Sequence, residues 1–105
     1  MATANDTMAS LINDRNALAA HTGQLSPAAG QYLWTAIDDI NNEIDQITAS
    51  SLLDASYVPQ TDPFKSVTNA SKQFIGTLHD IKSVFSGAAD VLAAADDVIK
   101  VILAL

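Results

Sequence analysis

The chain has 105 residues, with 5 Lys and Arg against 12 Asp and Glu, a formal net charge of −7 and no cysteine. The length fits one domain. Without cysteine the chain has no disulfide, no Cys-ligated zinc or iron–sulfur centre and no thiol nucleophile. The acidic balance argues against binding to nucleic acids, because phosphate contacts need clustered Lys and Arg. The same charge disfavours anionic membrane surfaces.

The first predicted helix covers residues 6–22. Asn5 suits its N-cap, and Asp6 is favourable in a first turn. Apolar residues then recur at helical spacing, at Met8, Leu11, Ile12, Leu18 and Ala19. Gly23 predicts the end of this helix, because glycine adopts a left-handed backbone without steric cost.

The second predicted helix covers residues 27–56, with Ser26 as its cap and Pro27 at its first position. Its apolar stripe steps by four and three residues, as in a heptad seam, through Leu33, Ile37, Ile40, Ile44 and Ile47. We assign the remaining acids and amides to an opposite polar face, formed by Asp38, Asp39, Asn41, Asn42, Glu43 and Asp45. Pro59 ends the helix, because a residue before proline avoids the helical region.

The third predicted helix covers residues 63–105, capped by Asp62. Its stripe runs in threes and fours, interrupted only by Ser71, through Phe64, Val67, Phe74, Leu78, Ile81, Phe85, Ala88, Leu92, Ala95, Ile99 and Ile102. Gly87 is the one helix breaker inside it, at a cost of about 1 kcal/mol relative to alanine. The unbroken phase favours one long helix. The alternative is a break at 86–87, with Ser86 capping a fourth helix.

The end of the chain carries the expected interaction surface. Its apolar residues point in almost every direction on a helix, at Val98, Ile99, Val101, Ile102, Leu103 and Leu105. A helix that is apolar on all sides has to be buried. Either this segment folds back into its own bundle, or it packs against another copy, a helical partner or a lipid surface, and we favour the second. Trp34 lies off the main seam. It either packs over the end of the first helix, which we favour, or is exposed as a further candidate contact for a partner.

No pattern in the sequence predicts catalysis or a bound cofactor. Asp38-Asp39 and Asp96-Asp97 are acidic pairs, but adjacent helical residues point about 100° apart and do not converge on one metal ion. His21 and His79 fit helix surfaces, and neither a Gly-x-Ser-x-Gly elbow nor a phosphate-cradling glycine loop occurs. We therefore predict no catalytic, cofactor-binding or metal-binding residue.

Together these patterns predict an all-α, antiparallel bundle of three long helices, or four if the chain breaks near Gly87. The expected function is a non-enzymatic protein-interaction or assembly module that forms a homo-oligomer, or binds a helical protein, through its apolar C-terminal helix. One alternative is an exported protein that uses this helix on a membrane. Another is a small acidic inhibitor or immunity-type protein whose Asp-rich second helix blocks a basic partner. With no classical signal peptide and no run of about 18–20 apolar residues, we expect a soluble protein, either cytoplasmic or exported by a dedicated system.

Overall fold

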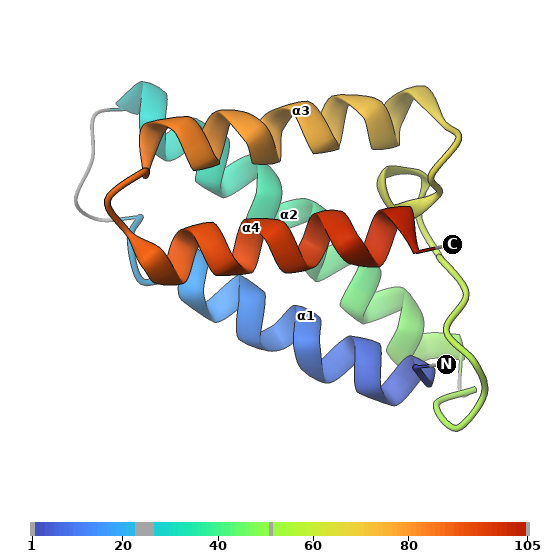
Figure 1. The fold of residues 1–105 in the computed structure, drawn as a ribbon. Helices are drawn as coiled ribbons and strands as arrows, with labels where there is room; N and C mark the ends of the chain where they lie inside the picture. The colour runs from blue at the N-terminus through green and yellow to red at the C-terminus, as the bar shows by residue number, and fades with distance from the viewer. Residues whose placement is uncertain (1, 23–26, 51, 105) are drawn as a thin grey trace.

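Four α-helices make up most of the chain in a computed structural model, which describes residues 2–22, 27–50 and 52–104. These are α1 (Ala4–Ala19), α2 (Pro27–Ser50), α3 (Asn69–Val84) and α4 (Ala89–Leu103), with a short 3-10 helix, η1 (Asp62–Phe64), before α3. Helix α1 packs against both α2 and α4, and so does α3. Helices that are in contact run antiparallel (Figure 1). The predicted all-α antiparallel bundle is confirmed, in its four-helix form.

Helix α1 begins two residues earlier than predicted, because its cap is Thr3 and not Asn5. The Thr3 hydroxyl accepts from the Asp6 N–H at 3.1 Å, and an Asp6 carboxylate oxygen accepts from the Thr3 N–H at 3.3 Å. This reciprocal pair satisfies two N–H groups at the helix start. The helix ends at Ala19 instead of residue 22. Gly23 and Ser26, the predicted end and start signals, lie outside the described residues.

The buried stripe of α1 also differs from the predicted one. Met8 and Ile12 are only partly buried and Ala19 is exposed, whereas Thr7 and Asp14 are buried. The buried positions follow one helical face in steps of three and four, through Ala4, Thr7, Leu11, Asp14 and Leu18. The prediction failed here because it counted only apolar side chains, and two of the five inward positions are polar.

Helix α2 ends at Ser50, not at residue 56. It is followed by a non-helical segment with a turn near its start, which we call the strap (residues 52–61). The strap pairs with the start of the chain. The Ala4 N–H donates to the Ala55 carbonyl at 2.8 Å and the Tyr57 N–H to the Ala2 carbonyl at 3.1 Å. The strap therefore closes the end of the bundle at which α1 begins and α4 ends (Figure 1).

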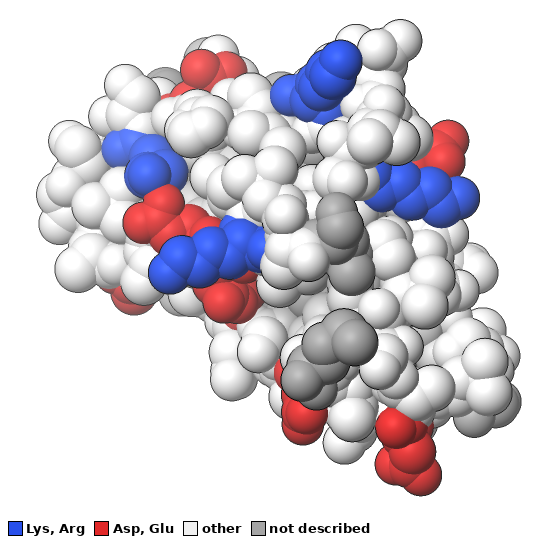
Figure 2. All heavy atoms as spheres, turned by 45° about the vertical axis from the view of Figure 1, so that its right-hand side comes forward, with Lys and Arg blue, Asp and Glu red and all other residues white. Residues whose placement is uncertain are grey.

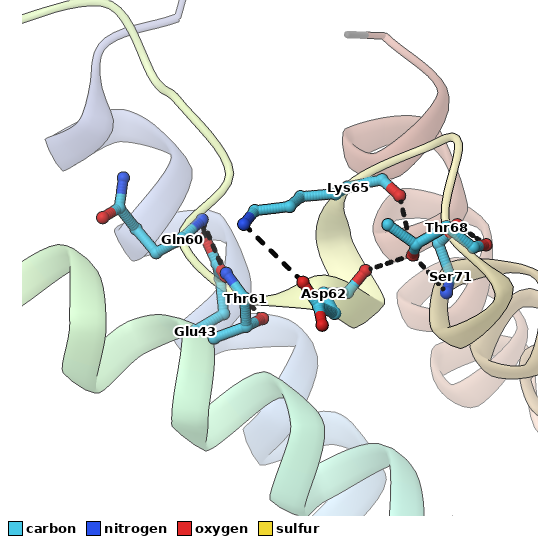
Figure 3. A network of polar contacts seen from close by, with 7 residues as sticks. All are labelled: Glu43, Gln60, Thr61, Asp62, Lys65, Thr68 and Ser71. Atoms are coloured by element: carbon cyan, nitrogen blue, oxygen red, sulfur yellow. Dashed lines mark hydrogen bonds and ion pairs between the residues drawn. The ribbon is translucent and has the colours of Figure 1, made fainter.

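Glu43 holds the strap against α2. Its carboxylate accepts from the Tyr57 hydroxyl at 2.6 Å, the Gln60 N–H at 2.9 Å and the Thr61 N–H at 2.9 Å. The Thr61 hydroxyl donates to it at 2.8 Å, and Figure 3 shows this side chain directed at the strap's end. Glu43 is fully buried, so its assignment to the exposed polar face was wrong. Its spacing from Ile40 and Ile47 places it beside the seam.

The predicted helix over 63–105 is three separate pieces. Residues 62–64 form only η1, although Phe64 is fully buried as expected. Helix α3 begins at Asn69, where the Thr68 hydroxyl accepts from the Ser71 N–H at 3.0 Å. The Ser71 hydroxyl donates to the Thr68 carbonyl at 2.8 Å, and Ser71 is fully buried (Figure 3). Ser71 is thus the polar first member of the buried face of α3.

The chain reverses direction between α3 and α4, over residues 85–88, so the preference for one unbroken helix was wrong. A single helix of that length would extend well beyond its neighbours and leave its second half without packing partners. Folding back buries that half between α1 and α3, at Val91, Ala94, Ala95, Val98 and Ile102. The apolar phase continues across the turn because α3 and α4 each present one stripe to the same core.

The seam of α2 is the most continuous part of the core, and a matched pair of substitutions tests it. Ile44 is buried and Asn42 is exposed on the other side of the helix. Ile44→Ala should lower the free energy of unfolding by about 2–4 kcal/mol, because truncation leaves a cavity. Asn42→Ala should change it by less than about 0.5 kcal/mol. Thermal melts of equal midpoint for the two variants would show that the face assignment is wrong.

Candidate functional site

The six predicted tail residues do not form one exposed surface. Val98 and Ile102 are fully buried in the core of their own chain, and Ile99 and Val101 are partly buried against it. Leu103 is 61% exposed, and Leu105 lies outside the described residues. Helices α1 and α3 cover most of this helix, so much of its apolar surface is buried within its own chain. Leu103 and the exposed parts of Ile99 and Val101 therefore remain available for contact with another molecule.

A hollow of about 310 Å³ lies between the start of α1 and the end of α4. Its lining mixes small, apolar and polar residues: Ala2, Asp6, Thr7, Ser10, Tyr57, Asp97, Lys100, Val101 and Ala104. Figure 2 turns this end of the molecule forward and shows charged side chains of both signs, scattered over a mostly uncharged surface. Residues 98–104 therefore contribute three residues, Lys100, Val101 and Ala104, to the wall of this depression.

Trp34 is the most exposed aromatic side chain of the described residues, with 53% of its surface accessible. It lies outside the seam of α2, next to the buried Leu33. The exposed residues that follow it at helical spacing, which we call the outward face of α2, are Asp38, Asn42, Asp45 and Ala49. Trp34 thus starts a surface stripe that contains two carboxylates. It is far along the bundle from Leu103 (Figure 1), so the predicted interaction residues belong to two places.

No Lys or Arg within α2 offsets the negative charge of its outward face. Residues 27–50 include no Lys or Arg. Lys65 pairs with Asp62 and Lys82 with Asp96, while Arg15 donates to the Asn41 amide oxygen at 3.1 Å. Burial, together with the neighbouring Asp38 charge, raises the pKa of Asp39. A cation placed along α2 would therefore be attracted by several carboxylates at once.

The two histidines have structural surroundings. His21 Nε2 lies 2.9 Å from an Asp90 carboxylate oxygen, and its ring meets Phe85 edge to face. This contact joins the end of α1 to the start of α4, and the hydrogen bond from His21 lowers the pKa of Asp90. His79 is exposed on α3. The described geometry places neither histidine beside an activated hydroxyl.

A pair of carboxyl groups, absent from our sequence predictions, joins α1 to α4, one of them buried and the other partly exposed. Asp14 is only 8% exposed, and its carboxyl group meets that of Asp97. Burial, the hydrogen bond to Asp97 and the charge of Asp97 raise the pKa of Asp14 to about 9. The signal for its position was its place between Leu11 and Leu18 on the inward stripe, which predicts burial for any residue type.

Among residues 2–22, 27–50 and 52–104, no group of three or more His, Asp or Glu side chains is arranged to hold a metal ion. No described helix is both long enough and apolar enough to cross a bilayer. Comparisons of the chain with protein-family models, with curated proteins and with solved structures found no significant match.

Proposed function

We propose that the chain is a non-enzymatic protein-interaction module that binds a basic partner through the outward face of α2. The observation that carries this proposal is the half-exposed Trp34 at the start of that face. A large aromatic side chain held on a rigid helix loses little entropy on binding, and Trp is enriched among residues that dominate binding energy. The fold supports this use, because the seam of α2 fixes the direction in which Trp34 points.

The charge of α2 supports a basic partner over an acidic or neutral one. Asp38 follows Trp34 by one turn and Asp45 by three, both exposed and without a basic residue on the same helix. Aligned carboxylates of this kind accelerate and orient the approach of Lys- and Arg-rich surfaces. A partner with a basic segment and one apolar residue to meet Trp34 fits this face best.

Trp34 is the only tryptophan in the chain, so its fluorescence reports directly on this face. The probe is an amphipathic Lys/Leu helical peptide, and a Lys/Ser peptide of equal charge is the control. We expect a blue shift of the Trp34 emission with the Lys/Leu peptide, at concentrations that produce no shift with the Lys/Ser peptide. Because the attraction is partly electrostatic, affinity should fall steeply as salt is raised.

Variants separate this site from general attraction to an acidic protein. With a labelled peptide, Trp34→Ala should weaken binding about 30-fold, the effect of losing a hot-spot residue. The double variant Asp38→Asn/Asp45→Asn should weaken it more than Asp54→Asn/Asp80→Asn, which removes the same charge from exposed positions outside α2. Equal losses in the two double variants, or an unaffected Trp34→Ala, would rule out this face as the binding surface.

A second candidate function is self-assembly through the end of α4. The observation that favours it is Leu103, which is 61% exposed at the end of the bundle that also exposes Leu52, Val58 and Val67. Clusters of exposed apolar side chains mark contact surfaces in many proteins. This candidate predicts a second copy of the chain as the partner. It is tested with the α4 variants described in the Discussion.

A further inference from the structure

The contact between α1 and α4 contains two carboxyl groups and too few hydrogen-bond donors. Asp14 Oδ2 is buried, and no donor from the described part of the chain reaches it. The Asp97 carboxyl group, which meets Asp14 from α4, also lines the hollow between the two helices. If both carboxyl groups were ionised while in contact, they would repel each other strongly, because Asp14 is shielded from water. One proton shared between them supplies the missing donor.

None of the salt bridges found among the described residues includes Asp14 or Asp97. On α1, Arg15 is held by Asn16 and Asn41, and Asp6 adds a further negative charge to the hollow. On α4, Lys100 lines the same hollow as Asp97. Because Asp14 is the more deeply buried of the two, its protonated form is favoured.

The other titratable groups near α1 and α4 have partners of their own. From α2, Glu43 accepts hydrogen bonds from the strap, including that of Tyr57, whose hydroxyl group lies near the hollow. From α3, Lys82 pairs with Asp96 on the outer side of α4, and His79 and Asp80 are exposed. The groups left to interact with Asp14 are therefore Asp97 and, in the wall of the same hollow as Asp97, Lys100.

We propose that Asp14 and Asp97 form a proton-dependent clasp, which holds α1 against α4 while one proton is shared and loosens their contact when that proton is lost. In the loosened state, Val98 and Ile102 pack less tightly. Both are fully buried and lie on α4, the helix that carries Asp97. The inference is independent of the proposed function, since it concerns the inner side of α1 and not the outward face of α2.

The expected pH dependence follows from the direction of the pKa shift. Folded Asp14 keeps its proton up to a pKa of about 9, whereas the unfolded chain loses it near the ordinary value of 3.8. The folded state thus binds more protons between these two values, so stability falls as the pH rises through this window. Asp14→Asn donates a hydrogen bond to Asp97 without a proton to lose, and should remove most of this dependence.

The test compares thermal unfolding of the wild type, Asp14→Asn and the exposed control Asp45→Asn between about pH 5 and about pH 9. We expect the wild type and the control to lose roughly 10 °C in Tm over this range, and Asp14→Asn to lose much less and to melt highest at the alkaline end. Parallel curves for all three proteins would overturn the clasp. Carboxyl ¹³C shifts of the wild type give a second measurement that needs no variant. An Asp14 carboxyl group that titrates near 3.8 would overturn the proposal as well.

Discussion

Replacing Glu43 with Ala should lower the free energy of unfolding by about 3–5 kcal/mol, one of the largest effects expected from any single polar residue in this chain. The substitution removes the common acceptor for the Tyr57 hydroxyl group and for the N–H groups of Gln60 and Thr61. Those donors would stay partly buried without a partner, and the strap would lose its attachment to α2. Chemical denaturation followed by circular dichroism measures the change.

The control for this substitution is Asp45→Ala, which removes an exposed carboxylate two residues further along the same helix. It should change stability by less than about 0.5 kcal/mol. In Glu43→Ala, amide hydrogen exchange at Gln60 and Thr61 should accelerate well before that of the α2 seam. If the two variants unfold at the same denaturant concentration, Glu43 does not hold the strap.

Ile102→Asp should unfold the bundle, whereas Leu103→Asp should leave it intact. Ile102 is fully buried between α1 and α3, and an unpaired carboxylate there costs more than a small domain can tolerate. Leu103 is adjacent in sequence but 61% exposed, so the same charge at that position remains in water. Circular dichroism should show helix loss for the first variant and a spectrum like the wild type for the second.

The same pair decides the second candidate function. If copies of the chain assemble through the end of α4, sedimentation should show an oligomeric wild type and a monomeric, folded Leu103→Asp. A wild type that stays monomeric at high concentration would exclude self-assembly through this end. An Ile102→Asp variant as helical and as stable as the wild type would contradict the position of α4 in the core.

Local signals predicted the helices well and their lengths less well. The stripe from Leu33 to Ile47 identified the buried face of α2, because a seam in threes and fours has only one inward direction. The break at residues 85–88 was not favoured, since two helices that face one core repeat the same phase as one long helix. Only the lengths of the neighbouring helices decide between them, and those depend on packing.

The candidate sites were harder to predict, because they depend on contacts between distant segments. Trp34 and the acidic residues of α2 could be identified from the sequence, because residue types and their helical spacing can be read from it directly. It did not show that Glu43 turns towards the strap or that Asp14 meets Asp97, since these contacts cross the fold. It also suggested a free apolar tail, because the residues that cover Val98 and Ile102 come from α1 and α3.

Amide NMR of the whole chain, recorded during titration with the Lys/Leu peptide, tests directly whether the outward face of α2 is the binding surface. We expect shift changes concentrated on residues 34–49, including the indole N–H of Trp34, and little change at Leu103 or at the strap. Changes confined to the end of α4, or a spectrum that the peptide does not alter, would contradict this assignment.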